Sequence, residues 1–280
     1  MKNKAMKNIK SIKSIIEDES GKFVKEYREY NNLGKEIIKE SYLEENKIEE
    51  RIITNYNDNG LISEEINYGE NNELNTKTTF YYNENNKINK IIVEFADGSK
   101  TIKSYLYDNN SKTITVTEKS DENEFEGKEK ITLNDNGNII EHQTLSEEDT
   151  IKEQVNYEFD EEGNILNEVN RNNSEITSKT KFYYNDNKNL TKRVISNAKG
   201  ETIDWAIFKY DEKGNITEQL FGDHTLYKIE NNENNKPIVE QKINAMGVIE
   251  YFKKYEYNSS GDLIKEEDLS ETTIFEYTYF

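Results

Sequence analysis

The chain has 280 residues, a formal net charge of −19 and no cysteine. The charge disfavours nucleic acid and anionic membranes as partners, because both attract Lys and Arg, and the missing thiols exclude disulfides and thiolate chemistry. Hydrophobic residues make up only 33% of the chain, but 11% are aromatic and one proline is present, a composition that favours thin β-sheet over disorder.

The N-terminal segment is rich in lysine and carries isoleucines at positions 9, 12, 15 and 16. These isoleucines fit one face of a short helix and equally an edge strand. We interpret residues 1–16 as a cap and residues 17–280 as one repeat domain. The segment has no apolar signal core, and no run of about 20 apolar residues follows. The chain is therefore expected to be cytoplasmic, with export after removal of a signal as the alternative.

A short motif recurs along the rest of the chain: an aromatic or apolar anchor residue, then Asn or Asp, then in most copies Gly three residues later. The anchors are Tyr30, Tyr56, Tyr82, Tyr107, Leu133, Phe159, Tyr184, Tyr210 and Tyr257. The first eight anchors are spaced by 25 or 26 residues. The longer interval after Tyr210 leaves room for two shortened units, with a degenerate anchor at Asn232. The sequence therefore predicts about ten units of roughly 26 residues.

The residues after each anchor have the chemistry of a tight turn. Asn or Asp at the first turn position accepts a hydrogen bond from the backbone two residues further on. Glycine three residues later supplies a left-handed backbone conformation. The turn glycines are Gly34, Gly60, Gly137, Gly163, Gly214 and Gly261. Asn86 tolerates the same conformation, whereas Ser111 and Lys188 suit it less well, so we expect their two turns to differ.

Strands are predicted on both sides of each turn. Apolar residues alternate with polar ones before the anchor, as in Tyr105–Tyr107 and Ile131–Leu133, which indicates half-buried antiparallel strands. We expect an all-β fold of tandem β-hairpins, forming a long twisted antiparallel sheet of about 20 strands. The sheet would be single-layered or curled into a superhelix, since twist accumulates, with a β-solenoid as the alternative. Residues 275–280 would end it on an exposed edge.

The repeat resembles a known family. Residues 210–218, Tyr-Asp-Glu-Lys-Gly-Asn-Ile-Thr-Glu, are similar to the YD repeat of bacterial Rhs proteins. Residues 257–264 and 160–166 resemble the same repeat, although Phe159, which precedes the second of these segments, stands where the family has Tyr. That family builds large spiral sheets around a toxic domain. This chain is far too short for such a shell and has no recognisable toxin or protease motif. It also resembles MORN-like, YwqK-type antitoxins, whose period is shorter. Both resemblances imply binding or enclosure.

Motifs for catalysis or metal binding are weak. His142 and His224 lie about three repeats apart without a metal-ligand spacing, so structural or surface roles are expected. Asn55, Asn57 and Asn59 look like the start of a calcium loop, but the twelfth position is Ile66 where a bidentate Glu is needed. We predict no catalytic residue, no metal site and no cofactor.

The best candidate for a binding surface surrounds Trp205, the only tryptophan. Trp and Tyr are enriched in binding hot spots, and we group Trp205 with Tyr183, Phe208 and Tyr210 as a candidate patch. Acidic residues that were expected to surround it are Asp186, Glu201, Asp204 and Asp211. The alternative is that Trp205 is a local core residue.

These features favour a non-enzymatic protein-binding repeat protein. An immunity-type or antitoxin-type binder of a basic effector is the favoured hypothesis, because the chain is strongly acidic. No nucleic acid or membrane is expected as a partner. The alternative is a structural or cell-surface module from an exported or adhesive protein.

Overall fold

The fold was analysed in a computed structural model, which describes residues 9–18, 21–44 and 47–280. These residues form 22 β-strands and one 3-10 turn, η1 (Glu70–Asn72). All of the strands belong to a single sheet. The all-β prediction is thereby confirmed. In the part of the chain that is described, no helix has the length and apolarity needed to cross a membrane.

The chain divides into two compact units. Unit 1 comprises Met1–Ile102 and Lys253–Phe280, and unit 2 comprises Lys103–Phe252. The strands of unit 1 are β1 (Ile9–Asp18), β2 (Gly21–Tyr30), β3 (Glu36–Glu44), β4 (Lys47–Tyr56), β5 (Ile62–Tyr68), β6 (Leu74–Tyr82), β7 (Ile88–Phe95), β21 (Leu263–Asp268) and β22 (Thr272–Tyr279). Strands β8 (Lys100–Asp108) and β20 (Ile249–Tyr257) each contribute residues to both units.

The strands of unit 2 follow one another along the chain. They are β9 (Thr113–Ser120), β10 (Phe125–Leu133), β11 (Ile139–Leu145), β12 (Ile151–Phe159), β13 (Ile165–Asn172), β14 (Glu175–Tyr184), β15 (Leu190–Asn197), β16 (Thr202–Tyr210), β17 (Ile216–Phe221), β18 (Leu226–Asn231) and β19 (Pro237–Ile243). Each pairs antiparallel with the next, which is the meander that alternating turns and strands predict.

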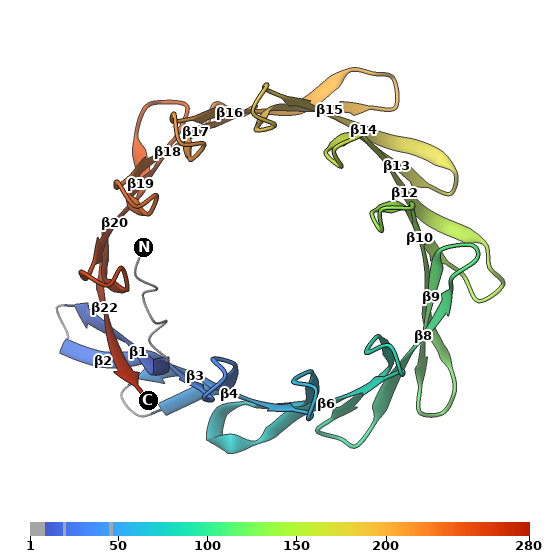
Figure 1. Cartoon of the computed structure of the whole chain (residues 1–280), viewed down its shortest axis with the longest axis horizontal. Helices are drawn as coiled ribbons and strands as arrows, with labels where there is room; N and C mark the ends of the chain where they lie inside the picture. Colours follow the sequence, from blue (N-terminus) through green and yellow to red (C-terminus); the bar gives the residue numbers. More distant parts are fainter. Residues whose placement is uncertain (1–8, 19–20, 45–46) are drawn as a thin grey trace, which may run out of the picture. The chain divides into compact units, whose positions relative to one another are not determined.

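In unit 1 the first and last strands of the chain are neighbours. Strand β1 pairs antiparallel with β2 on one side and with β22 on the other (Figure 1). Ile15 of β1 lies opposite Val24 in β2 and opposite Ile274 in β22. The ladder then continues from β22 through β21 to β20, and from β2 through β3 to β7.

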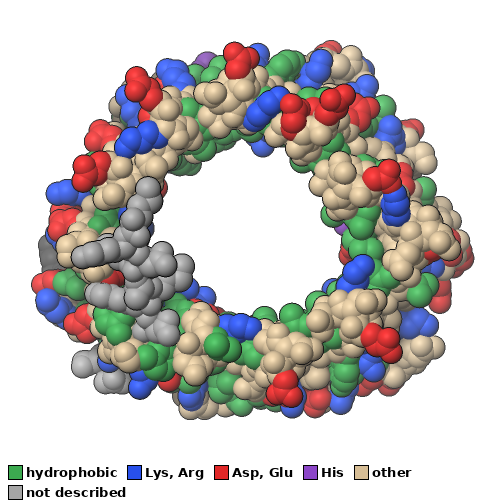
Figure 2. All heavy atoms as spheres, viewed as in Figure 1, with side chains coloured by type: hydrophobic (Ala, Val, Ile, Leu, Met, Phe, Trp, Pro, Cys, Tyr) green, Lys and Arg blue, Asp and Glu red, His purple; other side chains and the backbone are tan. Residues whose placement is uncertain are grey.

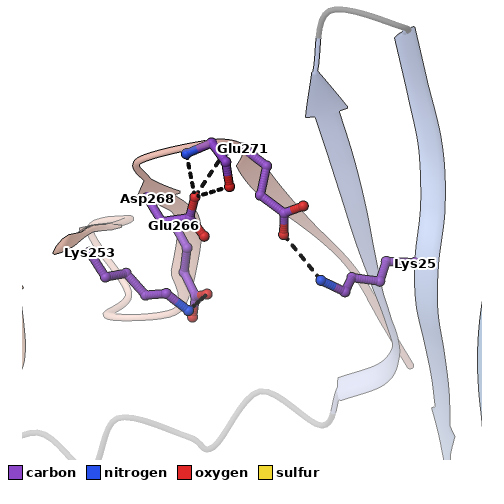
Figure 3. A network of polar contacts seen from close by, with 6 residues as sticks. Lys25, Lys253, Glu266, Asp268 and Glu271 are labelled. Carbon is purple, nitrogen blue, oxygen red and sulfur yellow. Dashed lines mark hydrogen bonds and ion pairs between the residues drawn. The ribbon is translucent and has the colours of Figure 1, made fainter. Parts of the chain in front are cut away.

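Side chains reinforce the pairing of the two chain ends. Ser11 and Thr278 share a hydrogen bond of 2.6 Å between their hydroxyl oxygens. Lys25, at the bulge of β2, donates a hydrogen bond of 3.1 Å to Glu271, which precedes β22 (Figure 3). Ser11 and Ile16 are among the few buried side chains of the described residues. The seam between β1 and β22 is therefore a well-packed part of the sheet.

This pairing overturns the predicted open ribbon. The sheet is closed through hydrogen bonding of β1 to β22, and it does not end on free edges there. An unpaired edge strand exposes backbone donors and acceptors, and here the two chain ends satisfy each other. Residues 9–16 are strand and not helix, and residues 275–279 are not an exposed edge; residues 1–8 of the predicted cap lie outside the described residues.

The sheet buries few hydrophobic side chains, as the low hydrophobic content of the chain predicted. Among the described residues, the buried hydrophobic side chains are Ile16, Val116, Leu145 and Ala206. Most other strand residues are half-buried. Acidic and basic side chains lie scattered among hydrophobic ones on the face shown in Figure 2. Stability therefore comes from many partly covered side chains and from strand pairing.

The predicted turn chemistry is confirmed. Asn57 accepts hydrogen bonds from the backbone of Asn59 and Leu61, and the amide of Gly60 donates to the Asn57 carbonyl. All six turn glycines have positive φ angles, between 72° and 89°. The same arrangement recurs at ten turns after an anchor position, which confirms the predicted number of about ten units. Nine of these turns close with the hydrogen bond pattern of Asn57 and Gly60.

Two details of the repeat differ from expectation. Lys188 adopts the left-handed conformation with a φ of 62°, so its turn resembles the others, whereas in the Ser111 turn the residue with positive φ is Lys112. Asn232 is the first turn residue and not the anchor, because its carbonyl accepts from the amide of Asn235. The degenerate anchor is therefore Asn231, which makes one unit short and leaves the next at full length.

Candidate functional site

Four anchor tyrosines, and Tyr277 of β22, each connect their strand to the preceding strand through the side-chain hydroxyl. The hydroxyl of Tyr82 donates to the backbone carbonyl of Ile62 at 2.6 Å, and the hydroxyl of Tyr210 donates to that of Leu190 at 2.8 Å. The same bond is made by Tyr56 to Glu36, Tyr184 to Ile165 and Tyr277 to Leu263. Asn231 replaces the hydroxyl with its side-chain amide, 3.4 Å from the Ile216 carbonyl. These tyrosines have a structural role.

Burial keeps these hydroxyls protonated. Desolvation raises the pKa of Tyr82 and of Tyr210 above the usual range. Burial, together with the Asp262 carboxylate, raises the pKa of Tyr277 to about 12. A neutral phenol is the form that donates a hydrogen bond. Tyr210, one of the predicted binding residues, therefore holds adjacent strands together.

Of the predicted binding residues, Trp205 and Tyr183 lie on one face of the unit 2 sheet. Residues directly opposite each other in adjacent strands share a face. Trp205 lies opposite Val194, which lies opposite Lys181. Tyr183 lies opposite Lys192, which lies opposite Ile207. We call this the lysine face.

The other two predicted residues, Phe208 and Tyr210, point to the opposite face. Phe182 lies opposite Arg193, and Arg193 lies opposite Ala206, so these three residues share that face. Phe208 lies two residues after Ala206 in the same strand and therefore points to the same face. The four residues therefore do not gather in one patch. The sequence contains this information, because successive residues of a strand point to opposite faces. Trp205 is an odd number of residues away from both Phe208 and Tyr210 and therefore points to the other face.

Two adjoining hollows lie along the lysine face. One, of about 320 Å³, is lined by Lys192, Val194, Thr202, Trp205 and Ile207. The other, of about 410 Å³, shares Val194 and Thr202 with the first and extends over β12 to β14. We call the two together the lysine–aromatic groove, which is lined by Glu158, Asn167, Glu168, Val169, Lys179, Thr180, Lys181, Tyr183, Lys192, Val194, Ser196, Gly200, Thr202, Trp205 and Ile207.

Lysines surround the aromatic rings of this groove. The ammonium groups of Lys181 and Lys192 lie 5.8 and 6.0 Å from the centre of the Tyr183 ring, within cation–π range. Tyr183 is 43% exposed, so a ligand could reach its ring. Trp205 is half-buried and makes an edge contact of 6.2 Å with the His224 ring.

Two of the four acidic residues predicted around Trp205, Asp204 and Asp211, do not line the groove. Asp204 lies on the opposite face, where Arg193 is 3.4 Å from its carboxylate. Asp211 is held in the turn after β16, where hydrogen bonds from Asn215 lower the pKa of its carboxyl. Alternation along β15 places Lys192 on the face of Val194, whereas the position of Lys181 opposite Val194 follows only from the pairing of β14 with β15.

The remaining candidates have local roles. His142 lies 2.9 Å from the Glu129 carboxylate on an adjacent strand, and His224 occupies a turn with a φ of 66°. Asn57 is engaged in its turn. Within the described ranges, no group of three or more His, Cys, Asp or Glu side chains is arranged to hold a metal ion.

A larger hollow of about 880 Å³ lies in unit 1, between β1, β2, β3 and β22. Its tyrosine hydroxyls are engaged with neighbouring carboxylates: Tyr27 donates to Glu29 at 2.9 Å, and Tyr42 donates to Glu40. Lysines also line this hollow, among them Lys10 and Lys13. The groove of unit 2, however, places lysines beside the exposed Tyr183 ring and contains two of the predicted binding residues. We therefore take the lysine–aromatic groove as the candidate site.

The strand order and the groove define the chain as an antiparallel β-hairpin repeat protein with a shallow surface site. No family model and no curated protein match it. Solved structures that resemble it include TcdB2-TccC3 without its hypervariable C-terminal region, at 13% identity and a TM-score of 0.44, over 88% of this chain. A second TcdB2-TccC3 structure gives 14% identity and a TM-score of 0.40. The chain spans only 12% of the length of either.

A porin-like protein from Bacteroides uniformis is also similar, at 8% identity and a TM-score of 0.35, over 96% of this chain and 98% of that one. The Rhs-like resemblance is supported only as far as an all-β repeat fold, which the strand order establishes by itself. Membership of the Rhs or antitoxin families stays a prediction.

Proposed function

We propose that this chain is a non-enzymatic protein-binding repeat protein and that the lysine–aromatic groove is its contact surface. The observation that carries the proposal is that the exposed Tyr183 ring and Trp205 share one strand face, separated by Lys192 and Val194 of β15, with Ile207 next to Trp205 on β16. Aromatic side chains in a shallow, partly apolar surface site are typical of protein contact surfaces. We also predict a cytoplasmic location for the protein, with export as the alternative.

The proposal does not extend the basic-partner prediction to this groove. That prediction drew on the net charge of −19, which acts over the whole chain. Next to Trp205, however, the charged side chains of the same face are Lys181 and Lys192. An immunity or antitoxin role therefore needs a partner that is identified experimentally.

The proposal is tested by site-specific cross-linking in the native host. A photo-reactive residue replaces Ile207, which lies three residues before the anchor Tyr210 and is 36% exposed. The matched control replaces Ser104, which is also exposed and lies three residues before the anchor Tyr107. We expect one protein to be captured from position 207 and not from position 104.

Trp205 supplies a second readout. Iodide should quench its emission in the free protein, and the captured partner should protect it. Trp205→Ala should weaken binding by about 2 kcal/mol if the ring is a hot spot. Capture of no protein, or equal capture from both positions, would favour the alternative of a structural or cell-surface module.

A further inference from the structure

We infer that the lysine–aromatic groove binds an acidic polypeptide segment that also carries apolar side chains. The inference rests on the proposed function and adds the chemistry of the partner. It is carried by a comparison within the chain, because strands β4 to β7 of unit 1 repeat the register of strands β12 to β15 of unit 2. Within these four strands, lysines and glutamates are equal in number on the first surface, whereas lysines outnumber glutamates on the second.

The aromatic side chains of the two surfaces correspond. Tyr81 lies opposite Lys90, as Tyr183 lies opposite Lys192. Tyr81 is 44% exposed and Tyr183 is 43% exposed. The Lys90 ammonium lies 5.0 Å from the centre of the Tyr81 ring. Ring exposure and ring–lysine contact are therefore common to these two surfaces.

The charges around the rings differ. In unit 1, Lys77 lies opposite Glu94 and its ammonium is 2.6 Å from the Glu64 carboxylate. In unit 2, Lys179 takes the place of Lys77, but the residue opposite it is Ser196. Lys179 makes no ion pair among the described residues.

The position of Glu64 is filled by an amide in unit 2. Glu64 lies opposite Asn55, whereas Asn167 lies opposite Glu158. The carboxylate has thus moved one strand further from the lysines, and Asn167 donates a hydrogen bond of 2.6 Å to it.

A third lysine is added in unit 2. Thr79, which lies opposite Glu64 and Ile92, is replaced by Lys181, which lies opposite Asn167 and Val194. The corresponding charged positions are Lys77, Lys90, Glu64 and Glu94 in unit 1, and Lys179, Lys181, Lys192 and Glu158 in unit 2. In the first set two lysines accompany two glutamates, of which Glu64 is paired with Lys77 and Glu94 with Lys100 of β8, whereas in the second set three lysines accompany one glutamate.

A basic surface is unusual in a chain with a net charge of −19. The lysines Lys179, Lys181 and Lys192 have no carboxylate within ion-pair distance in the described part of the chain, so they are available to an anionic ligand. One side of the groove is apolar, because Val194 lies opposite Lys181, and Trp205 and Ile207 follow on β16 beyond Val194 and Lys192. Carboxylates satisfy lysines, and apolar side chains are needed to cover the rings. A polypeptide provides both, whereas phosphates or sulfates alone provide only charge.

The inference is tested with peptides of defined sequence and the whole protein. A fluorescein-labelled peptide of alternating Glu and Leu is titrated, and its anisotropy is measured alongside Trp205 emission. A peptide of alternating Lys and Leu and a single-stranded polythymidylate are the comparison ligands. We expect the acidic peptide to bind, to shift the emission of Trp205, and to weaken with added salt.

The matched variant moves a carboxylate without changing the composition. Glu158→Asn combined with Asn167→Glu restores the arrangement of unit 1 beside Lys179. Adding Lys181→Thr and Ser196→Glu completes the unit 1 pattern and should raise the Kd of the acidic peptide about tenfold, since several exposed charge contacts are lost. Thr79→Lys in unit 1, outside the groove, should leave the Kd unchanged.

Each outcome has one meaning. Equal or stronger binding of the basic peptide, or an unchanged Kd in the complete variant, would overturn the acidic-peptide inference. Equal binding of polythymidylate would replace it with a general polyanion site. Capture of a partner through position 207, without preference for the acidic peptide, would retain the proposed function and refute the inference alone. No peptide binding together with no cross-linked protein would refute both.

Discussion

The hydroxyl of Tyr210 donates a hydrogen bond of 2.8 Å to the backbone carbonyl of Leu190, at the start of the adjacent strand β15. Leu190 lies at the bulge beside Tyr184, where the regular pairing of β14 with β15 shifts. The phenol hydroxyl thus donates to a backbone carbonyl at a β-bulge, where the regular pairing of the two strands is interrupted. The same relationship recurs between Tyr82 and Ile62, where the pairing of β4 with β5 shifts.

Removal of this hydroxyl should weaken the fold. Tyr210→Phe keeps the ring and leaves the Leu190 carbonyl without its partner, so we expect a loss of about 1 kcal/mol in the free energy of unfolding. Urea denaturation measures the loss. Tyr183→Phe is the control, because the Tyr183 hydroxyl makes no hydrogen bond within the described residues. Equal stability of both variants would mean that water replaces the Tyr210 bond without cost.

Turn glycines should resist β-branched substitution. Gly163 and Gly214 have φ angles of 89° and 85°. A Cβ atom at Gly163 would have its nearest neighbour at 3.6 Å, an ordinary contact, so the penalty comes from backbone strain and not from a clash. We expect Gly163→Val and Gly214→Val each to cost about 1–2 kcal/mol.

Asparagine provides the control for these variants. Asn86 occupies the equivalent turn position with a φ of 57°. Gly163→Asn should therefore cost less than Gly163→Val in thermal unfolding. A valine variant with wild-type stability would show that the turn relaxes to another conformation.

The seam between the chain ends should contribute to stability. Ile16 is 4% exposed in β1, so Ile16→Ala should cost about 2–5 kcal/mol. Ile203, which is 59% exposed in β16, is the control, and Ile203→Ala should change stability by less than about 0.5 kcal/mol. Amide exchange adds an independent measurement, since β1 and β22 should be protected like interior strands. Rapid exchange throughout β22 would contradict the closed sheet.

Alkaline pH should weaken the last repeat. The pKa of Tyr277 is raised to about 12, so the folded state holds this proton more tightly than the unfolded chain, whose pKa is about 10. Its stabilisation is complete below about pH 10 and is lost as the pH rises toward 12. Unfolding curves measured from pH 9 to 12 should show a smaller decline for Tyr277→Phe than for wild type. Parallel declines would assign the alkaline sensitivity to other groups.

The repeat could be predicted from sequence because its signals are local. An Asn or Asp side chain bonds to its own turn, and glycine admits a positive φ, whatever the rest of the chain does. The same local turn geometry explains the backbone of Lys188, a residue with no preference for positive φ angles, which adopts a φ of 62° in its hairpin. At Asn231 the unit departs from its aromatic anchor, and the structure identifies the position through the turn bond from Asn235 to Asn232 and the contact of Asn231 with Ile216.

The candidate site was predictable only in part. Trp205 and Tyr183 were selected by residue type, and they do share a face, whereas Phe208 and Tyr210 belong to the other face. Alternation along one strand could have separated them. The charge around Trp205 depends on which residues of β14 and β15 lie opposite each other, and bulges that shift this register are not marked reliably in the sequence.

The sequence by itself determined the β-hairpin unit, its turns and the number of repeats, because these follow from backbone preferences and alternation within a few residues. Tertiary structure alone decided that β1 pairs with β22 and that lysines gather around Tyr183. Closure depends on twist and bulges summed over many strands, and small differences in each decide whether two distant ends meet. Lys181 and Lys192 become neighbours of one ring only through strand register, which is a property of pairs of segments and not of either segment alone.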